Sequence, residues 1–158
     1  MKKGDSELKL RKAIGFFFLI IVVVFVVDHI FKFIIAKKGC FLFMCLDYAT
    51  NTGAAFSLFA GTAWARVLLI IVGVFILVIV AYFYFKTRDR LMLKIAFPLI
   101  FGGTISNLLN RLFLGYVVDI FTFSFWHQFP KFNIADVANL VGVILLIVYL
   151  LGKNDKRK

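Results

Sequence analysis

The sequence is poor in the residues that most enzymes use for nucleophilic or metal chemistry. Among 158 residues it has 2 cysteines, Cys40 and Cys45, and 2 histidines, His29 and His127. The cysteines are too few for a disulfide framework and lack the spacing and histidine partners of a zinc site, and whether they pair with each other stays open. Neither histidine lies in a recognisable nucleophile motif. We therefore expect no metal and no cofactor.

Acidic residues are also scarce, with 8 Asp and Glu against 19 Lys and Arg and a net charge of +11. The basic residues form short clusters between apolar runs and are not interleaved with aromatic residues on one face. This pattern argues against nucleic acid as a partner. Anionic membrane lipid is the expected counterpart of these charges.

The apolar residues lack the alternation of β-barrel strands, although they make up 63% of the chain, against roughly 45–50% in soluble domains. Four uninterrupted runs approach or exceed the ~20 residues that span a bilayer, and a helix satisfies its own backbone there. No small-residue cleavage site follows the first run, so we expect no cleavable signal peptide. The sequence predicts a single domain, 1–158, an all-α membrane protein with four transmembrane helices and a small extracytoplasmic, partly β, loop domain. The predicted helices are 13–36, 67–85, 91–109 and 134–151.

The distribution of Lys and Arg predicts the orientation. They gather in the N-terminal tail, in the connection after the second helix and in the C-terminal tail, and such clusters stay in the cytoplasm. Both termini are therefore predicted to be cytoplasmic, and the connections 37–66 and 110–133 to face outward. Trp64 and Trp126 fall in these connections and are expected to be interfacial anchors.

Four carboxylates lie outside the predicted cytoplasmic segments: Asp28, Asp47, Asp119 and Asp136. Asp28 stands in an apolar helix, where a charge costs ~2.5–3.5 kcal/mol. Lys32 follows four residues later, so one interpretation is an ion pair on the helix surface that snorkels outward. The other is that Asp28 supports or binds something at the outer boundary.

Asp119 and Asp136 are predicted to lie at the same outer membrane level. Asn133 is placed to cap the last helix with Asp136 in its first turn, which is a purely structural interpretation of that acid. A cap does not explain Asp119. Two acids brought together beside lipid share a proton, and such a pair activates water with one carboxylate while the other polarises a scissile carbonyl.

Other polar residues at this level are Asn51, Asn107, Asn110 and Arg111. Amides and a guanidinium at the membrane edge are suited to hold a peptide backbone or a lipid headgroup. Each also has a structural interpretation. Asn51 suits a turn, Arg111 suits a headgroup anchor, and the glycines 102–103 suit close helix packing.

Five stretches, in this order along the chain, resemble the lipoprotein signal peptidase family, also called signal peptidase II. They are Asp28 with Lys32, Asn51-Thr-Gly-Ala-Ala-Phe56, Gly102-Gly103 leading to Asn107 and Arg111, Gly115-Tyr-Val-Val-Asp119, and Phe129-Pro-Lys-Phe-Asn133-Ile-Ala-Asp136. Each alone is weak, but together with four apolar runs they form a specific pattern.

The resemblance implies an aspartic endopeptidase of the bacterial inner membrane with its active site at the outer face. Its implied substrate is a diacylglyceryl-modified prolipoprotein, from which it removes the signal peptide by cutting before the lipidated cysteine. We expect it to act as a monomer. The implied catalytic residues are Asp119 and Asp136, and the implied substrate-binding residues around them are Asp28, Asn51, Asn107, Arg111 and Asn133.

Two positions depart from the family's pattern. Asn110 stands where an Asp usually precedes Arg111, and Ser106 stands where a Gly usually precedes Asn107. A salt bridge from residue 110 to Arg111 is therefore not possible, which leaves open how the guanidinium is held.

The competing hypothesis is a small proton- or cation-coupled transporter in which Asp28, Asp119 and Asp136 relay the ion. Such a protein is expected to carry its acids near the bilayer midplane. Here the acids are predicted at the outer boundary, which disfavours a transporter.

Overall fold

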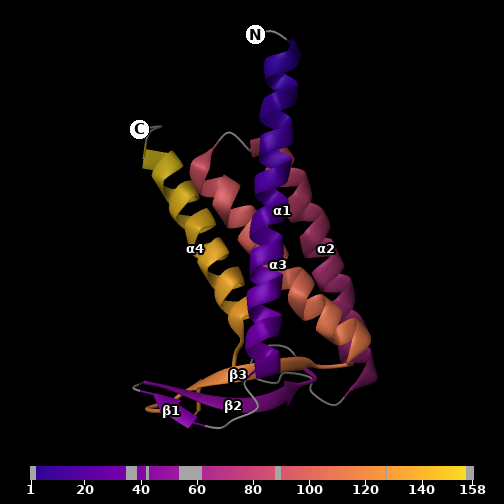
Figure 1. Cartoon of the computed structure of the whole chain (residues 1–158), viewed down its shortest axis with the longest axis vertical. Helices are drawn as coiled ribbons and strands as arrows, with labels where there is room; N and C mark the ends of the chain where they lie inside the picture. The colour runs from indigo at the N-terminus through magenta and orange to yellow at the C-terminus, as the bar shows by residue number, and fades with distance from the viewer. Residues whose placement is uncertain are drawn as a thin grey trace.

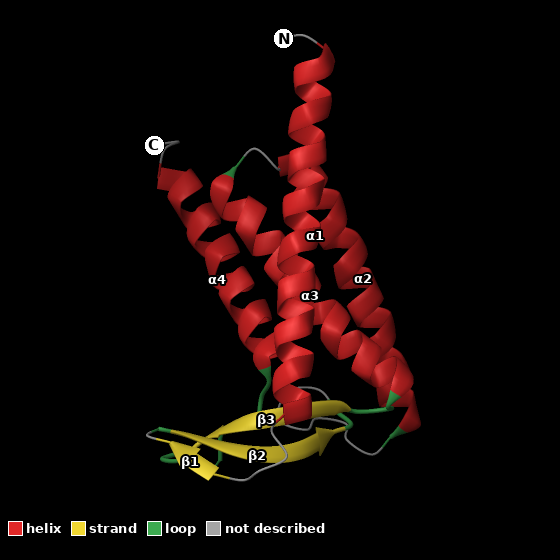
Figure 2. Ribbon diagram, viewed as in Figure 1, coloured by secondary structure: helices red, strands yellow, loops and turns green. Residues whose placement is uncertain are grey.

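The computed structural model of the chain describes residues 3–34, 39–41, 43–53, 62–87, 90–126 and 128–155. Within them, four helices form a bundle and three strands form a sheet at one end of it (Figures 1 and 2). Each helix contains a stretch of at least 19 residues that is long and apolar enough to cross a membrane. The chain is thus a multi-pass membrane protein, and the predicted fold class of four transmembrane helices with a small β-containing part is confirmed. The helices are α1 (Lys3–Ile34), α2 (Ala63–Thr87), α3 (Leu91–Phe113) and α4 (Ile134–Asp155).

The first and last helices extend beyond the apolar runs that predicted them. α1 begins at Lys3 instead of 13, and α4 ends at Asp155 instead of 151. Hydropathy detects only the part of a helix that lies in lipid, whereas polar turns continue a helix equally well in water. Residues 35 and 36 of the first predicted helix lie outside the described residues.

The two middle helices are also longer, which shortens the predicted connections. α3 continues through Asn110 and Arg111 to Phe113, so the connection predicted at 110–133 begins only after that residue. α2 begins at Ala63, inside the connection predicted at 37–66, and places Trp64 in its first turn. Trp64 and Trp126 are both about half exposed, while their role as membrane anchors stays a prediction.

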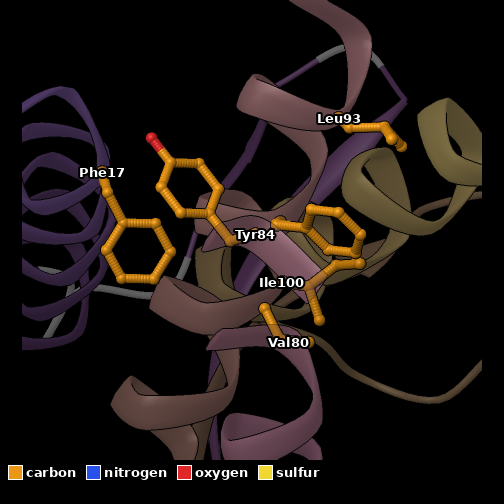
Figure 3. Close-up of a cluster of buried hydrophobic side chains, with 6 residues drawn as sticks. Phe17, Val80, Tyr84, Leu93 and Ile100 are labelled. Atoms are coloured by element: carbon orange, nitrogen blue, oxygen red, sulfur yellow. The ribbon is translucent and has the colours of Figure 1, made fainter. Parts of the chain in front are cut away.

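α3 is the central helix of the bundle. In an 18-residue apolar window of α3, 56% of the residues are buried inside the protein, against 17% in the corresponding window of each of the other three helices. Figure 1 shows it crossing behind α1, with α2 and α4 on either side. The half of the bundle farther from the sheet contains an apolar cluster of Phe17, Val80, Tyr84, Leu93, Phe97 and Ile100 (Figure 3). The Tyr84 hydroxyl is satisfied there by the carbonyl oxygen of Ala13, at 2.6 Å.

Glycines allow α3 and α4 to pack closely. A Cβ atom on Gly103 would overlap the carbonyl oxygen of Ala135, and one on Gly142 would lie 2.8 Å from the carbonyl oxygen of Ala96. Because both obstacles are backbone atoms of the facing helix, a side chain at either glycine would force the two helices apart.

The sheet is antiparallel in the order β1-β2-β3 and lies at the end of the bundle opposite both termini (Figure 2). Its strands are β1 (Gly39–Phe41), β2 (Met44–Asn51) and β3 (Val117–Phe123). A disulfide joins Cys40 to Cys45 across β1 and β2, which answers the question left open by the sequence. Backbone hydrogen bonds between Phe121 and Phe132 bring the segment before α4 against β3.

Replacing Gly142 with Ala is expected to destabilise the bundle, because overpacking a close contact typically costs ~1–3 kcal/mol. We expect the unfolding temperature in detergent to fall. Gly15→Ala on α1 is the matched control, because nothing lies within 4 Å of a Cβ atom there. Equal unfolding temperatures for the two variants would contradict the close packing of α3 on α4.

Candidate active site

A cavity of about 410 Å³ lies between the sheet and the adjacent ends of α3 and α4. It brings together residues from four parts of the chain that are far apart in sequence. The polar side chains that line it are Asn51, Asn107, Arg111, Asp119, Lys131 and Asp136. Both acids predicted to be catalytic therefore face one space, together with three of the five predicted substrate-binding residues.

Asp119 reaches the cavity from the buried strand β3. The residue is only 3% exposed. One of its carboxylate oxygens accepts a hydrogen bond from Asn51 Nδ2 at 3.1 Å, and the other accepts one from Asn133 Nδ2 at 2.8 Å. Burial, and to a smaller extent the negative charge of Asp136, raise the pKa of Asp119 to about 6. The hydrogen bonds from Asn51 and Asn133 act in the opposite direction and lower this pKa. An acid with this pKa exchanges its proton near neutral pH.

Asp136 lies in the first turn of α4, where it forms a reciprocal cap with Asn133. The Asn133 side-chain oxygen accepts the backbone N–H of Asp136 at 2.9 Å, and the Asp136 carboxylate accepts the backbone N–H of Asn133 at 3.1 Å. The other carboxylate oxygen accepts a hydrogen bond from Asn107 Nδ2 at 2.8 Å. The capping interpretation is therefore correct, yet the same carboxylate also lines the cavity.

Asn133 joins the two acids. It is fully buried, and its Nδ2 donates to Asp119 while its backbone and side-chain oxygen hold Asp136. The same Nδ2 lies 3.2 Å from Asn107 Oδ1. One amide thus fixes β3 and the start of α4 relative to each other, and with them the two carboxylates.

Asp28 does not line the cavity, although it was predicted among the residues around the substrate. It is fully buried, and its Oδ2 lies 2.6 Å from Lys32 Nζ and accepts the Ser106 hydroxyl at 2.6 Å. Its Oδ1 accepts the backbone N–H of Ala135 at 3.1 Å. Asp28 therefore supports the beginning of α4 directly behind Asp136.

The ion pair of Asp28 with Lys32 is present, but of the two interpretations of Asp28 the one in which this pair snorkels outward is wrong. The Lys32 side chain is only 6% exposed, because its ammonium group turns inward to three buried acceptors. Besides Asp28, these are Asn110 Oδ1 at 2.9 Å and Asn107 Oδ1 at 3.4 Å. Asn107 also donates a hydrogen bond to Asp136, so this one side chain links the Lys32 ammonium group to the acid pair.

The two positions that depart from the family's pattern both belong to this buried cluster. Ser106 donates to Asp28, and Asn110 accepts from Lys32. Arg111 is instead held by backbone carbonyl oxygens, that of Gly53 at 3.0 Å and that of Asn107 at 3.4 Å. Its Nε is buried without a hydrogen-bond partner among the described residues.

Asn51 both forms the turn that the sequence suggested and contacts the acid pair. Its Oδ1 accepts the backbone N–H of Gly53 at 2.9 Å, which forms the turn, and its Nδ2 donates to Asp119. Residues 54–56 of that motif lie outside the described residues.

Sequence reasoning missed Lys131 in the cavity wall, and it missed the buried contacts that Ser106 and Asn110 make behind the cavity. Lys131 forms an ion pair with Asp47 at 2.5 Å. It lies within the sequence motif that ends at Asp136, and this position could have indicated that it lies near the site. In the parts of the chain that the structure describes, no group of three or more His, Cys, Asp or Glu gathers to hold a metal ion, and a metal-free reaction stays a prediction.

Removing the charge of Asp136 is expected to lower the pKa of Asp119, because that charge is one of the causes that raise it. In Asp136→Asn, the carboxyl band of Asp119 in infrared spectra should lose its proton at a lower pH than the wild-type midpoint of about 6. The band is assigned by its loss in Asp119→Asn. Asp47→Asn is the control and should leave the midpoint unchanged. An unchanged midpoint in Asp136→Asn would show that the two carboxyls do not interact.

Known proteins resemble this chain along almost its whole length. The family described as Signal peptidase (SPase) II matches residues 20–152. The lipoprotein signal peptidase of Actinobacillus succinogenes is 34% identical over 160 residues, covering 94% of this chain and 98% of that protein. That of Staphylococcus aureus is 35% identical over 155 residues, covering 92% and 93%. A bacterial membrane enzyme solved by the in meso method superimposes with a TM-score of 0.83 at 32% identity, covering 92% of this chain and 93% of that one. The chain belongs to the signal peptidase II family.

Proposed function

We propose that the chain is an aspartic endopeptidase that removes the signal peptide from diacylglyceryl-modified prolipoproteins by cutting before the lipidated cysteine. The observation that carries the proposal is the acid pair, Asp119 and Asp136, which face one cavity and are joined through Asn133. Membership of the signal peptidase II family supports this function over ion transport.

In the proposed reaction the acid pair shares one proton. The ionised carboxylate takes a proton from water, whose oxygen attacks the scissile carbonyl, while the protonated acid donates a hydrogen bond to the carbonyl oxygen. Collapse of the tetrahedral intermediate breaks the C–N bond, and a proton passes to the leaving amine. Asn51, Asn107 and Asn133 already hydrogen-bond the carboxylate oxygens, so the acids are oriented before the substrate binds.

The cavity also has groups suited to the substrate. Arg111 lines it and carries a buried Nε without a partner among the described residues, so a substrate oxygen would satisfy a donor that costs free energy when left unpaired. The cavity lies where the helices meet the sheet, which is the level at which a lipidated cysteine would hold its peptide bond. The described residues form this cavity within one chain, so the proposed reaction needs no second copy.

We place the sheet and the acid pair on the outer face of the bacterial inner membrane, with both termini in the cytoplasm. The termini lie at the end of the bundle opposite the sheet (Figure 1), and clusters of Lys and Arg accompany that end. The disulfide between Cys40 and Cys45 supports the same orientation, because disulfides persist outside the reducing cytoplasm.

Cysteine labelling tests this orientation. A cysteine introduced at Asn154, in the last turn of α4, should react with a membrane-impermeant maleimide only after the cells are opened. A cysteine at Ser124, next to the sheet, should react in intact cells. Labelling of Asn154→Cys from outside would overturn the orientation.

The acid pair is tested by cleavage of a purified, diacylglyceryl-modified precursor, with the products weighed by mass spectrometry. Asp119→Asn and Asp136→Asn should each lower kcat by at least roughly 10²–10⁴-fold, because each removes the base or the acid. The double variant should lose little more, since the two carboxyls act as a unit.

Asp47→Asn is the matched control, because Asp47 lies on the neighbouring strand β2 and its ion pair with Lys131, whose side chains are 34% and 32% exposed, is worth only ~0–1 kcal/mol. It should keep most of the activity. Near-normal turnover by Asp136→Asn would show that Asp136 is only a helix cap.

A precursor without diacylglycerol, tested alongside, should be cut poorly or not at all. Equal cleavage of the two precursors would refute recognition of the lipid.

A further inference from the structure

Asn110 lies in the buried cluster behind the acid pair and is not among the residues that line the catalytic cavity. It is only 5% exposed. Its Oδ1 accepts a hydrogen bond from Lys32 Nζ at 2.9 Å, and its Nδ2 lies 3.4 Å from His29 Nε2. Its side-chain amide therefore bridges two residues of α1, one of which carries a buried charge.

The His29 ring determines which end of this amide faces Lys32. His29 Nδ1 lies 3.0 Å from the carbonyl oxygen of Phe25, and since a carbonyl oxygen only accepts, this nitrogen carries the proton. In the neutral ring Nε2 is then an acceptor, and Asn110 Nδ2 is the donor beside it. The amide oxygen of Asn110 is left to face Lys32.

The Lys32 ammonium group is shared between one charged and two neutral acceptors. Among the described residues, Asp28 is its one carboxylate partner, at 2.6 Å. The amide oxygens of Asn110 and Asn107 are the others, at 2.9 Å and 3.4 Å. An amide holds an ammonium group without cancelling its charge, whereas a second carboxylate would bind it more strongly and draw it away from Asn107.

Asn107 transmits this arrangement to the acid pair. Its Oδ1 accepts from Lys32 and from Asn133, so its Nδ2 faces Asp136, at 2.8 Å. The charge itself acts on the second acid. Burial has the largest influence on the pKa of Asp119 and raises it, while the positive charge of Lys32 is among the influences that lower it.

We propose that Asn110 is a positioning residue of the reaction, a neutral acceptor oriented by His29 that keeps the Lys32 ammonium group on Asn107 and leaves its charge to act on the acid pair. This inference rests on the proposed function and concerns a residue that touches neither acid. A carboxylate at position 110 should therefore make the acid pair ionise at a higher pH.

The other charges around Asp119 stay the same when position 110 is changed. Asp136 faces it from α4 and Arg111 from α3. Lys131 lines the same cavity and is paired with Asp47 of β2. A shift in the titration of Asp119 therefore reports the change that is made behind the cavity.

His29 is a titratable neighbour of position 110, and it would take up a proton beside a new carboxylate and cancel the added charge. The comparison is therefore made in His29→Phe. The new ring can keep the stacking on Phe25, where the ring centroids are 4.0 Å apart in the unaltered protein. Asn110→Asp places its carboxylate within reach of Lys32, so the added charge is paired and the fold should tolerate it.

The midpoint of the Asp119 carboxyl band in infrared spectra is measured for His29→Phe alone and combined with Asn110→Asp or Asn110→Ala. We expect Asn110→Asp to raise the midpoint by at least roughly half a pH unit, because an added negative charge favours the protonated acid. Asn110→Ala removes the acceptor without adding charge and should shift the midpoint less than half as much. Equal shifts for the two variants, or no shift with Asn110→Asp, would show that Asn110 only fills space.

A second variant decides the question if Asn110→Asp does not fold. Asp28→Asn combined with Lys32→Met removes both charges of the buried ion pair, a replacement that proteins often tolerate. It takes from Asp119 the same positive charge that lowers its pKa. The midpoint should therefore rise, and an unchanged midpoint would overturn the inference.

The carboxyl band is read without substrate, so its result is independent of the proposed function. Cleavage of the lipidated precursor is measured in parallel, and absence of product from the unaltered protein would refute the proposed function alone. The acidic limb of the pH profile of kcat/KM should move with the midpoint. Below the midpoint, Asn110→Asp should then be about threefold slower than its His29→Phe parent, the ratio that half a pH unit gives. A limb that stays in place while the midpoint moves would refute a role for Asn110 in the reaction.

Discussion

The geometry of the site depends on one buried charge that does not touch the cavity. Asp28 is fully buried in α1, and a buried charge without partners is penalised by several kcal/mol. Lys32, the Ser106 hydroxyl and the backbone N–H of Ala135 satisfy it. Because Ala135 directly precedes Asp136, the bonds that stabilise Asp28 also determine where α4 begins and hence where one acid of the pair lies.

A helix cap and a catalytic acid are often treated as alternatives, but here one side chain is the cap and, in the proposed function, also the acid. Asp136 and Asn133 cap α4 reciprocally, and Asn133 also reaches across to Asp119. The cap gives Asp136 a rigid position at the end of a membrane helix. Rigid placement is what an acid needs if it is to hold a water molecule and a carbonyl group in line.

The sequence was sufficient for the four helices, because long apolar runs in a chain without strand alternation leave few alternatives. It also indicated that Asp119 and Asp136 share one membrane level. It did not reveal the cluster behind them, since Ser106 and Asn110 each contact a residue 78 positions away in α1. Helical periodicity predicts which face a residue occupies, whereas its partner depends on how the helices pack. For the same reason the inward turn of Lys32 was missed.

Arg111 and Asn107 belong to the walls of two cavities at once, and this has a consequence for inhibition. A small molecule that engages the guanidinium from the second cavity, of about 180 Å³ and lined by residues of α2, α3 and α4, would compete with one that engages it from the cavity of the acid pair. Compounds of unrelated shape, one bound in each cavity, would thus exclude each other without overlapping. Pairs of such inhibitors would behave as mutually exclusive in double-inhibition kinetics.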